Sequence, residues 1–219
     1  MAREQQQQAN SQAQRLRITF GKLGSQKYIG HLDLAKTWER ILRRAEISLS
    51  YSQGFSAHPK IQLATALPLG ITSECELMDV WLDHPIPLDG LADHLMSVSP
   101  PGLPVYKIEE IPAKAPSLPS LLMSAVYVFT PLIEIDDLAQ RVSDFLAQTR
   151  VVRTRRDRPY DLRPLVLDLK VEADNKLRVE MIQTEQGAGR PDELIEALGL
   201  HSGDFNVHRV QIKLSKART

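Results

Sequence analysis

The chain has 219 residues, is 42% hydrophobic and carries a formal net charge of zero. Its single cysteine, Cys75, excludes an internal disulfide framework, an all-cysteine metal site and a cysteine-ligated iron–sulfur cluster. The first residues do not form a signal peptide, and no apolar run reaches the roughly 18 residues that a membrane span needs. We therefore expect a cytoplasmic protein without a membrane segment, built as one large domain or two small ones.

The charges are distributed unevenly along the chain. Residues 15–60 contain nine Lys and Arg against three Asp and Glu, whereas residues 61–149 contain three against twelve. Between Arg150 and Arg163 there are six arginines and two aspartates. Two basic blocks allow a neutral protein to bind a polyanion locally, although charge runs are also typical of solvated faces.

The first half of the chain has the pattern of an α+β unit. Residues 1–14 are polar and Gln-rich, which predicts a disordered tail. The first unit is then predicted over residues 15–111. Its expected elements, in chain order, are a strand at 15–20, a loop at 22–27, a helix at 32–45, short strands at 47–51 and 60–66, a strand at 76–82, a short helix at 88–96 and a strand at 105–111. This order is that of a ferredoxin-like β-α-β-β-α-β unit.

The helix predicted at residues 32–45 is amphipathic. Helical spacing places Leu34, Trp38, Ile41, Leu42 and Ala45 on one face. The opposite face then carries four basic residues, Lys36, Arg40, Arg43 and Arg44. We expect the first set to be buried and the second to be exposed.

The order of elements is predicted to repeat after a proline-containing linker at residues 112–120. The second unit, residues 121–219, is expected to contain a strand at 124–130, a helix from 138, a hairpin formed by 165–172 and 176–183, a helix at 192–198 and a strand at 205–214. The fold prediction is therefore α+β, with two tandem ferredoxin-like units.

Aromatic, histidine and lysine residues gather in the turns that flank the basic helix, where binding and catalytic groups usually lie. His31 could act as a general base, or it could cap the helix or bond to the turn. His58 precedes Pro59 and could contact a phosphate or a base, or belong to a structural turn. Tyr28 and Phe55 could stack on unpaired bases, with partial burial under the turn as the alternative for Phe55.

Three further groups of residues have a structural and a functional interpretation. Strand alternation would place Arg153 and Arg155 on one side, while Asp161 and Arg163 could pair internally and fix a turn. The segment Gly187-Ala-Gly189 could cradle a phosphate or form an ordinary turn. The carboxylates of residues 74–79 have no histidine beside them, so we predict no metal site and no cofactor.

Several motifs resemble a bacterial family of unknown function that is called radical-SAM-linked, because its members are fused to, or encoded beside, a radical SAM protein. The motifs are Lys22…Tyr28-Ile-Gly-His-Leu-Asp33, Arg43-Arg44-Ala45, Tyr51-Ser-Gln-Gly-Phe55 with His58-Pro-Lys60, Ala66-Leu-Pro-Leu-Gly70 with Ser73-Glu74, and Asp161-Leu-Arg-Pro164. The resemblance implies a radical SAM protein as partner. The radical SAM cluster motif is absent from this chain, so the chain is not itself the radical enzyme.

A second resemblance concerns architecture. Two tandem ferredoxin-like units with a basic first helix are similar to the repeat-processing ribonucleases of CRISPR systems. In those enzymes a histidine near the first helix acts in metal-independent RNA cleavage, and His31 occupies a comparable place. Their glycine-rich loop precedes the last strand, whereas Gly187-Ala-Gly189 precedes the last predicted helix.

The sequence thus predicts a non-catalytic RNA-binding or substrate-presenting accessory module that acts with a radical SAM enzyme in RNA modification or translation. The two basic blocks would form one groove between the halves. One alternative is a metal-independent ribonuclease that uses His31 with Tyr28 or His58, and another is a protein-interaction adaptor whose acidic residues 74–93 dock a basic partner. The predicted RNA-binding residues are Lys22, Lys27, Tyr28, His31, Lys36, Arg40, Arg43, Arg44, Tyr51, Gln53, Phe55, His58, Lys60, Arg153, Arg155, Arg156 and Arg163.

Overall fold

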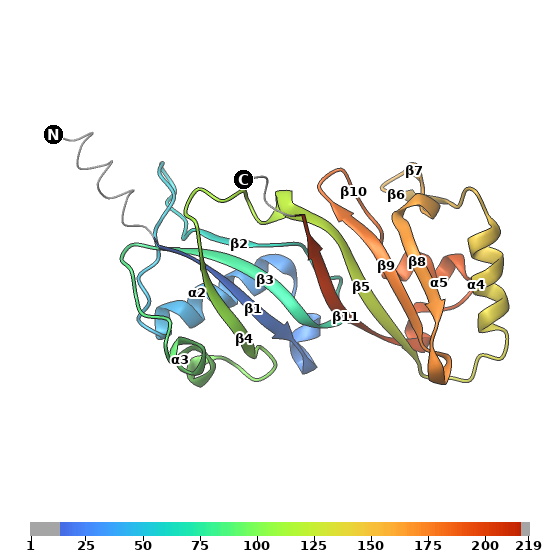
Figure 1. Ribbon diagram of the computed structural model, residues 1–219, viewed down its shortest axis with the longest axis horizontal. Coiled ribbons are helices and arrows are strands. Elements are labelled where there is room, and N and C mark those ends of the chain that lie inside the picture. Colours follow the sequence, from blue (N-terminus) through green and yellow to red (C-terminus); the bar gives the residue numbers. More distant parts are fainter. Residues whose placement is uncertain (1–13, 216–219) are drawn as a thin grey trace. The chain divides into compact units, whose positions relative to one another are not determined.

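The computed structural model describes residues 14–215 and shows an α+β protein, in which α-helices accompany a mixed β-sheet (Figure 1). The chain divides into two compact units. Within the described residues, unit 1 comprises 14–69 and 75–119, and unit 2 comprises 70–74 and 120–215. Residues 1–13 of the predicted tail lie outside the described part, whereas Gln14 is buried and begins the first strand.

Unit 1 contains most of the elements predicted for the first half. In chain order they are β1 (Gln14–Lys22), the 3-10 helix η1 (Gly24–Tyr28), α2 (His31–Arg44), β2 (Ile61–Leu63), β3 (Thr72–Leu82), α3 (Leu91–Val98) and β4 (Val105–Ile111). The strands are hydrogen-bonded in the order β4–β1–β3–β2, which is fourth, first, third and second along the chain. β4 is antiparallel to β1, and β2 is antiparallel to β3.

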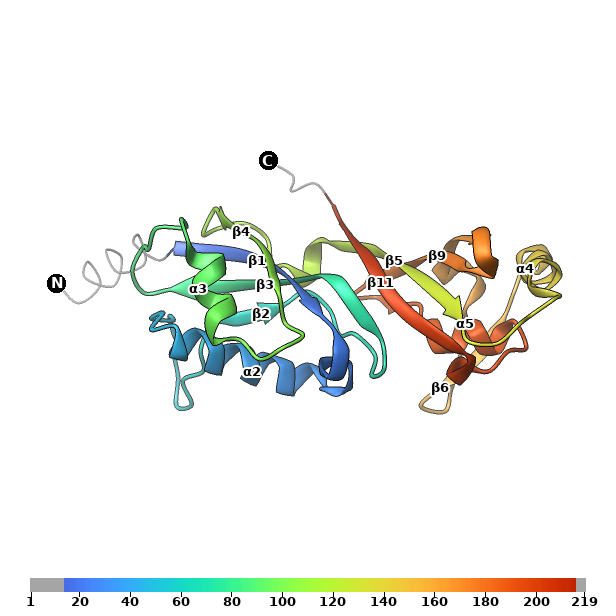
Figure 2. The ribbon, with the colours of Figure 1, turned by 90° about the horizontal axis from the view of Figure 1, so that it is seen from below.

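The core of unit 1 lies between its strands and the apolar faces of α2 and α3. Trp38 of α2 is fully buried, and its ring packs edge-on against Phe20 of β1, with ring centroids 4.8 Å apart. Leu91 and Leu95 of α3 belong to the same cluster of buried residues. Both helices lie on one side of the strands (Figure 2). The predicted buried face of α2 is confirmed, since Leu34, Ile41, Leu42 and Ala45 are all buried.

The other side of β1 is polar yet buried. Asp79 of β3 has no exposed surface, and its carboxylate accepts hydrogen bonds from Arg15 at 2.6 Å and from Arg17 at 2.8 Å. Arg15 also donates to the carbonyl oxygens of Ala115 and Pro116. The Asp79 carboxylate is therefore held in ion pairs that join β1 to β3 and to the segment after β4.

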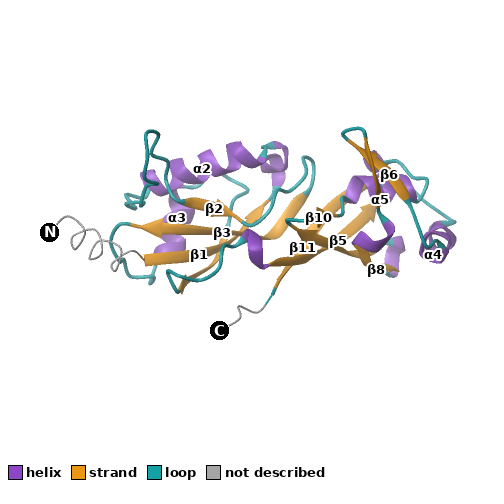
Figure 3. Ribbon diagram, turned by 90° about the horizontal axis from the view of Figure 1, so that it is seen from above, coloured by secondary structure: helices purple, strands orange, loops and turns teal. Residues whose placement is uncertain are grey.

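The strands predicted at 47–51 and 60–66 are wrong in extent. The structure has β2 and two isolated bridges, Leu49 with Leu82 and Tyr51 with Pro59. Between Tyr51 and Pro59 the chain leaves the sheet as a loop, which lies between α2 and β2 in the chain (Figure 3). Proline cannot donate to a strand ladder, and Ser, Gln and Gly favour turns, which explains the shortened strands.

Unit 2 is built from a sheet of long strands, a small separate hairpin and two α-helices. Its elements after η2 (Pro119–Leu121) are β5 (Leu122–Pro131), α4 (Leu138–Ala147), β6 (Val152–Arg155), β7 (Arg158–Asp161), η3 (Arg163–Leu165), β8 (Val166–Val171), η4 (Ala173–Asn175), β9 (Leu177–Thr184), β10 (Gly187–Ala188), α5 (Pro191–Ala197), η5 (Ser202–Asp204) and β11 (Phe205–Leu214).

The four long strands of unit 2 are hydrogen-bonded in the order β11–β5–β9–β8, and each neighbouring pair is antiparallel. The first residues of β3, which belong to unit 2, add a parallel pair in which Thr72 lies opposite His208 and Ser73 opposite Arg209. The predicted hairpin across residues 173–176 is confirmed as β8–η4–β9.

Strands β6 and β7 form a separate two-stranded hairpin within the predicted arginine-rich block. Its turn consists of Arg156 and Asp157, which both have left-handed backbone angles, with φ of 50° and 61°. Such a turn matches the twist of the flanking strands. The Asp161 carboxylate then accepts hydrogen bonds from the backbone N–H of Val151 at 2.8 Å and of Arg163 at 3.1 Å, which fixes the exit from the hairpin.

Candidate nucleic-acid interface

The outward face of α2 carries a cluster of basic residues. Its four predicted basic residues, Lys36, Arg40, Arg43 and Arg44, are all exposed, which confirms the assignment of faces. Asp33 in the first turn and two arginines in the last turn complement the helix dipole. Within residues 14–215, none of the four basic side chains is in an ion pair or hydrogen bond. Their charges are therefore available to a ligand.

Three of these arginines surround a surface hollow. Arg40, Arg43 and Arg44, together with Thr37, line a volume of about 300 Å³. No carboxylate lines this hollow. Guanidinium groups present several N–H donors in one plane and suit bidentate contacts to phosphate. The hollow, which we call the arginine hollow, thus has the size and charge of an anion site.

A second hollow adjoins the first, because Arg43 lines both. This hollow of about 330 Å³ is also lined by Tyr51 and by the carboxylates of Glu39, Glu46 and Asp83. Carboxylates repel phosphate, whereas they can accept hydrogen bonds from the N–H groups of a base. A nucleic-acid backbone would therefore be favoured at the arginine hollow rather than here.

The loop from Tyr51 to Pro59 presents a fully exposed aromatic ring. The backbone N–H of Ser52 donates to the His58 carbonyl at 2.8 Å, and the His58 N–H donates to the Ser52 hydroxyl at 3.0 Å. These bonds close the base of the loop and leave Phe55 at its tip, with 115% relative exposure. Partial burial of Phe55 under the turn, the alternative raised by the sequence, is wrong.

Other predicted residues lie at the opposite end of α2. Lys27 lies over the ring of the exposed Tyr28, with its Nζ 5.1 Å from the ring centroid. His31 is the exposed first residue of α2, so it is not the helix N-cap, which is Gly30. A helix of 14 residues is about 21 Å long. Because the loop follows the far end of α2 (Figure 2), His31 and His58 do not share a site.

One predicted RNA-binding residue of unit 1 is buried. Lys22 has 1% exposure, and its Nζ donates to the Ile29 carbonyl at 2.9 Å. Its burial at the end of β1 does not support the predicted RNA contact. Gln53 is exposed, and Lys60 is half-buried.

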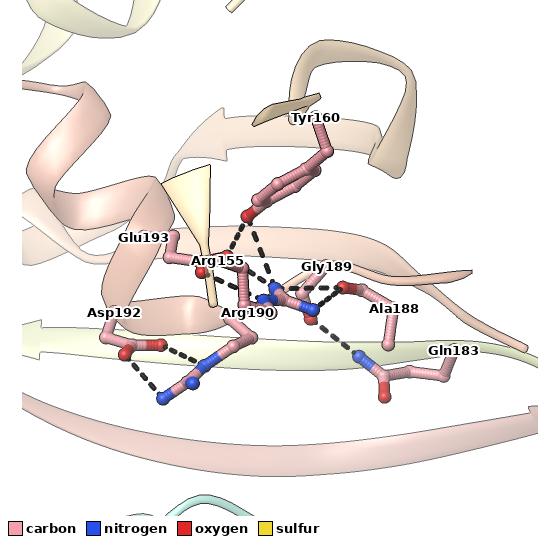
Figure 4. A network of polar contacts seen from close by, with 8 residues as sticks. All are labelled: Arg155, Tyr160, Gln183, Ala188, Gly189, Arg190, Asp192 and Glu193. Carbon is pink, nitrogen blue, oxygen red and sulfur yellow. Dashed lines mark hydrogen bonds and ion pairs between the residues drawn. The ribbon is translucent and has the colours of Figure 1, made fainter. Parts of the chain in front are cut away.

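The second basic block differs from the α2 face, because the side chains of two of its arginines, Arg155 and Arg163, have internal partners. Arg155 forms an ion pair with Glu193 of α5 at 2.6 Å and donates to the Ala188 carbonyl at 3.3 Å (Figure 4). The Tyr160 hydroxyl donates to the same Glu193 carboxylate. These contacts fasten the β6–β7 hairpin to α5, so the prediction of Arg155 as an RNA ligand is not supported by its surroundings.

The same cluster shifts two pKa values in opposite directions. Burial raises the pKa of Tyr160 to about 12, and the hydrogen bond to the negatively charged Glu193 acts in the same direction. Burial by itself would raise the pKa of Glu193, but the hydrogen bonds from Arg155 and Tyr160 outweigh it and hold that pKa below its usual value. Glu193 is therefore a carboxylate at neutral pH, with Tyr160 protonated beside it.

The remaining arginines of this block divide into engaged and exposed residues. Arg153 is half-buried on the same side of β6 as Arg155, as strand alternation predicts. Arg163 bonds to Asp161 through its backbone N–H, at 3.1 Å, while its guanidinium donates to the Val166 carbonyl at 3.2 Å. Arg156, in the hairpin turn, is exposed.

Gly187 belongs to the short strand β10, and Gly189 directly follows it. Gly187 and Ala188 pair with β9, and the Gly189 carbonyl accepts a hydrogen bond from Gln183 at 2.8 Å (Figure 4). A Cβ on Gly189 would lie 2.7 Å from the methyl carbon of Met181. Met181 and the Leu165 carbonyl therefore pack closely around Gly189, and the strand pairing of Gly187 and Ala188 does not support the phosphate-cradle interpretation.

Three residues of these surfaces are not among those that the sequence patterns indicate. Thr37 precedes Arg40 and Arg44 at helical spacing, so the period of α2 could have placed it beside them. Tyr160 and Glu193 are 33 residues apart, and no local pattern connects them.

Among residues 14–215, no three His, Cys, Asp or Glu side chains gather closely enough to hold a metal ion. No helix in that range combines the length and apolarity of a membrane span.

Comparison with known families gives one match. A family model described as "Uncharacterized protein conserved in bacteria (DUF2344)" matches residues 15–191. The match includes α2, the loop after it and the β6–β7 hairpin, and ends at the start of α5. The description names neither a radical SAM partner nor a CRISPR ribonuclease. A search of curated proteins finds no match.

Proposed function

The chain belongs to the DUF2344 family of uncharacterized bacterial proteins, and we propose that it is a non-catalytic RNA-binding or substrate-presenting accessory module. It would act with a radical SAM enzyme in the cytoplasm, in RNA modification or translation. The observation that carries the proposal is the exposed face of α2. There, three arginines without ion-pair partners among residues 14–215 line one hollow, and no carboxylate accompanies them.

Electrostatics favour a phosphate ligand for this face. Closely spaced cations on a rigid helix repel one another, and a polyanion relieves that repulsion while it releases its own counterions. The opposite, apolar face of α2 belongs to the core of unit 1, which fixes the helix and therefore the side from which the arginines project. RNA is the polyanion that also fits the aromatic residues beside the helix, because unpaired bases stack on aromatic rings.

The radical SAM partner rests on the family resemblance of the motifs and on no contact within the chain. Its test is the isolation of the native complex. We expect co-purification from the bacterium itself to yield a radical SAM protein together with bound RNA, identified by mass spectrometry and sequencing. A preparation with RNA but without a radical SAM protein would leave the RNA-binding proposal intact and remove the enzyme partner.

We also infer that each unit is ferredoxin-like. The support is the strand order, which is fourth, first, third, second in unit 1 as β4–β1–β3–β2 and in unit 2 as β11–β5–β9–β8. The fold of each unit does not determine how the two units are arranged, so the RNA-binding groove predicted between the halves stays a prediction. A crystal structure in which either unit had another strand order would overturn this inference.

The alternative of a protein-interaction adaptor is weaker than the sequence implied. Within the acidic segment 74–93, Glu76 and Asp79 are buried, and Asp79 is already paired with two arginines. The exposed acidic surface is therefore smaller than the count of carboxylates indicates.

A salt titration by fluorescence anisotropy tests the RNA-binding proposal. Arg40→Glu with Arg43→Glu should weaken the binding of a single-stranded RNA by about 100-fold, since each charge-assisted hydrogen bond to phosphate is worth roughly tenfold or more. The slope of log affinity against log salt should fall by about 0.7 for each phosphate that the variant no longer neutralises.

The matched control has the same change in charge on the same unit. Lys107→Glu with Lys114→Glu alters exposed residues far from α2 in the chain. This pair should change affinity much less. Equal reductions in RNA affinity for both pairs of substitutions would mean that only the net charge of the protein matters. If the wild type does not bind RNA in dilute salt, the RNA-binding proposal is wrong.

A further inference from the structure

The loop after α2 combines a rigid base with an exposed tip. Its base is closed by the Tyr51–Pro59 bridge and by the paired bonds between Ser52 and His58. The Lys60 N–H donates to the Ser50 carbonyl at 2.8 Å, which continues the ladder toward the sheet. Near the tip, Gly54 has a φ of 130°, a conformation that only glycine adopts easily. The backbone therefore directs the loop outward instead of folding Phe55 back onto unit 1.

The loop exposes one aromatic ring fully and a second in part. Phe55 has no buried surface, and Tyr51 at the base is half exposed. A phenylalanine ring gains free energy when it leaves water, so a fully exposed ring on a closed loop is available for burial by a ligand. The residues around Phe55 are small or polar, which leaves its faces accessible.

The arginine hollow lies next to the base of this loop. Tyr51 lines the same hollow as Arg43, and Arg43 also lines the arginine hollow. Phe55 lies four positions after Tyr51 in the chain, a reach of at most about 14 Å. Phosphate sites and exposed aromatic rings are thus contiguous within unit 1.

The charged residues of the two hollows determine on which side the backbone of a bound RNA strand would lie. The carboxylates of Glu39, Glu46 and Asp83 beside Tyr51 repel phosphate, so the backbone of a ligand is confined to the arginine side. The uncharged bases can then turn toward Tyr51 and the loop. Bases inside a duplex are covered on both faces by their neighbours, whereas an unpaired base offers a free face for stacking.

We propose that the loop of residues 51–59 selects unpaired RNA, with Phe55 stacked on one base while the arginine hollow holds a neighbouring phosphate. This inference rests on the proposed RNA binding and names the kind of RNA that the site prefers. The ligand is a single-stranded segment, a hairpin loop or a bulge rather than a continuous duplex.

The test compares three substitutions of Phe55 on two RNAs of the same sequence, one single-stranded and one annealed to its complement. Phe55→Ala should weaken binding of the single strand by about 5- to 150-fold, the range expected when one base–aromatic stack is removed. Duplex affinity and the slope of log affinity against log salt should stay unchanged, because no charge is altered. Phe55→Trp should restore single-strand binding, whereas Phe55→Leu, which keeps apolar area without a π face, should bind like Phe55→Ala.

The outcomes separate this inference from the one on which it rests. If the wild type binds RNA through Arg40 and Arg43 but Phe55→Ala changes nothing, or weakens both RNAs equally, the loop does not select unpaired bases and only this inference fails. If Phe55→Leu binds like the wild type, stacking is likewise overturned. If the wild type binds no RNA but binds phosphatidylglycerol vesicles in a manner that Phe55→Leu preserves, both proposals fail and the face is a membrane-binding surface.

Because Phe55 makes no core contact, the thermal unfolding of all three variants should match that of the wild type. Circular dichroism during heating checks this directly. A fall in affinity with unchanged unfolding therefore reports on binding alone.

Discussion

The α2 face and the β6–β7 hairpin are both rich in arginine, but the arginines of α2 are exposed, whereas Arg155 of the hairpin is bonded to other residues of the protein. Arg40, Arg43 and Arg44 are exposed and lie around a hollow without a carboxylate. Arg155 is half-buried and pairs with Glu193, and Arg163 donates to a backbone carbonyl. The density of arginines along a chain therefore does not tell which of them can meet a phosphate. Exposure and the absence of an internal partner decide that.

The two regions differ because of their secondary structure and neighbours. In α2, the helical period turns every basic residue away from the apolar face that fills the core. In β6, the two-residue period turns Arg153 and Arg155 toward the body of unit 2, where α5 supplies a carboxylate. The first region therefore keeps its charge for a ligand, whereas in the second region Arg155 uses its charge to hold a hairpin in place.

The greatest change is expected in stability, at the hairpin. Arg155→Glu places a second negative charge beside Glu193 and leaves the Ala188 carbonyl without its donor, so the free energy of unfolding should fall by about 3 kcal/mol. Chemical denaturation followed by circular dichroism measures this. Arg43→Glu is the matched control, because it makes the same change of charge at an exposed residue and should leave the free energy of unfolding unchanged. If Arg155→Glu and Arg43→Glu had the same free energy of unfolding, Arg155 would not stabilise the fold more than an exposed arginine of α2 does.

A smaller effect on stability is expected for Tyr160, which donates to the same Glu193 carboxylate as Arg155 does. Tyr160→Phe removes one hydrogen bond and should lower the free energy of unfolding by about 1 kcal/mol at neutral pH. The raised pKa of Tyr160 adds a pH dependence. Its contribution to stability is fully present below pH 10.0, the ordinary tyrosine pKa, and disappears as the pH rises through about 12.

The difference in stability between wild type and Tyr160→Phe should therefore shrink across that alkaline range. Urea denaturation at several pH values measures the difference and cancels the titration of the other tyrosines. A difference that stayed constant from neutral to alkaline pH would show that the Tyr160 hydroxyl is not held by Glu193 in solution.

The least change is expected at the other end of α2. His31→Ala should keep the fold and change RNA affinity by no more than about threefold, because His31 lies at the end of α2 away from the loop. Anisotropy and a cleavage assay without added metal are the measurements. Metal-independent cleavage that disappears in this variant would establish the ribonuclease alternative and displace the non-catalytic proposal.

Local sequence patterns were sufficient for the elements whose side chains repeat at one period. The spacing of Leu34, Trp38, Ile41 and Leu42 identified the buried and exposed faces of α2. The predicted strand at 105–111 coincides with β4, and the hairpin across 173–176 was placed correctly. The strands predicted at 47–51 and 60–66 were too long, because the turn-forming residues between them outweighed their short apolar runs, and only β2 and two isolated bridges formed.

In this protein, residue spacing along the chain is enough to predict the α+β class, the amphipathic helix and its basic face, since each depends on side chains within one element. The folded chain is needed to show which basic residues remain available. Lys22 is buried by the turn that follows its own strand, and Arg155 finds Glu193 across 38 residues of chain. Such pairs form because packing brings distant elements together and burial makes an uncompensated charge costly. No local period encodes them, so only tertiary packing distinguishes an arginine that can bind a ligand from one that holds the fold together.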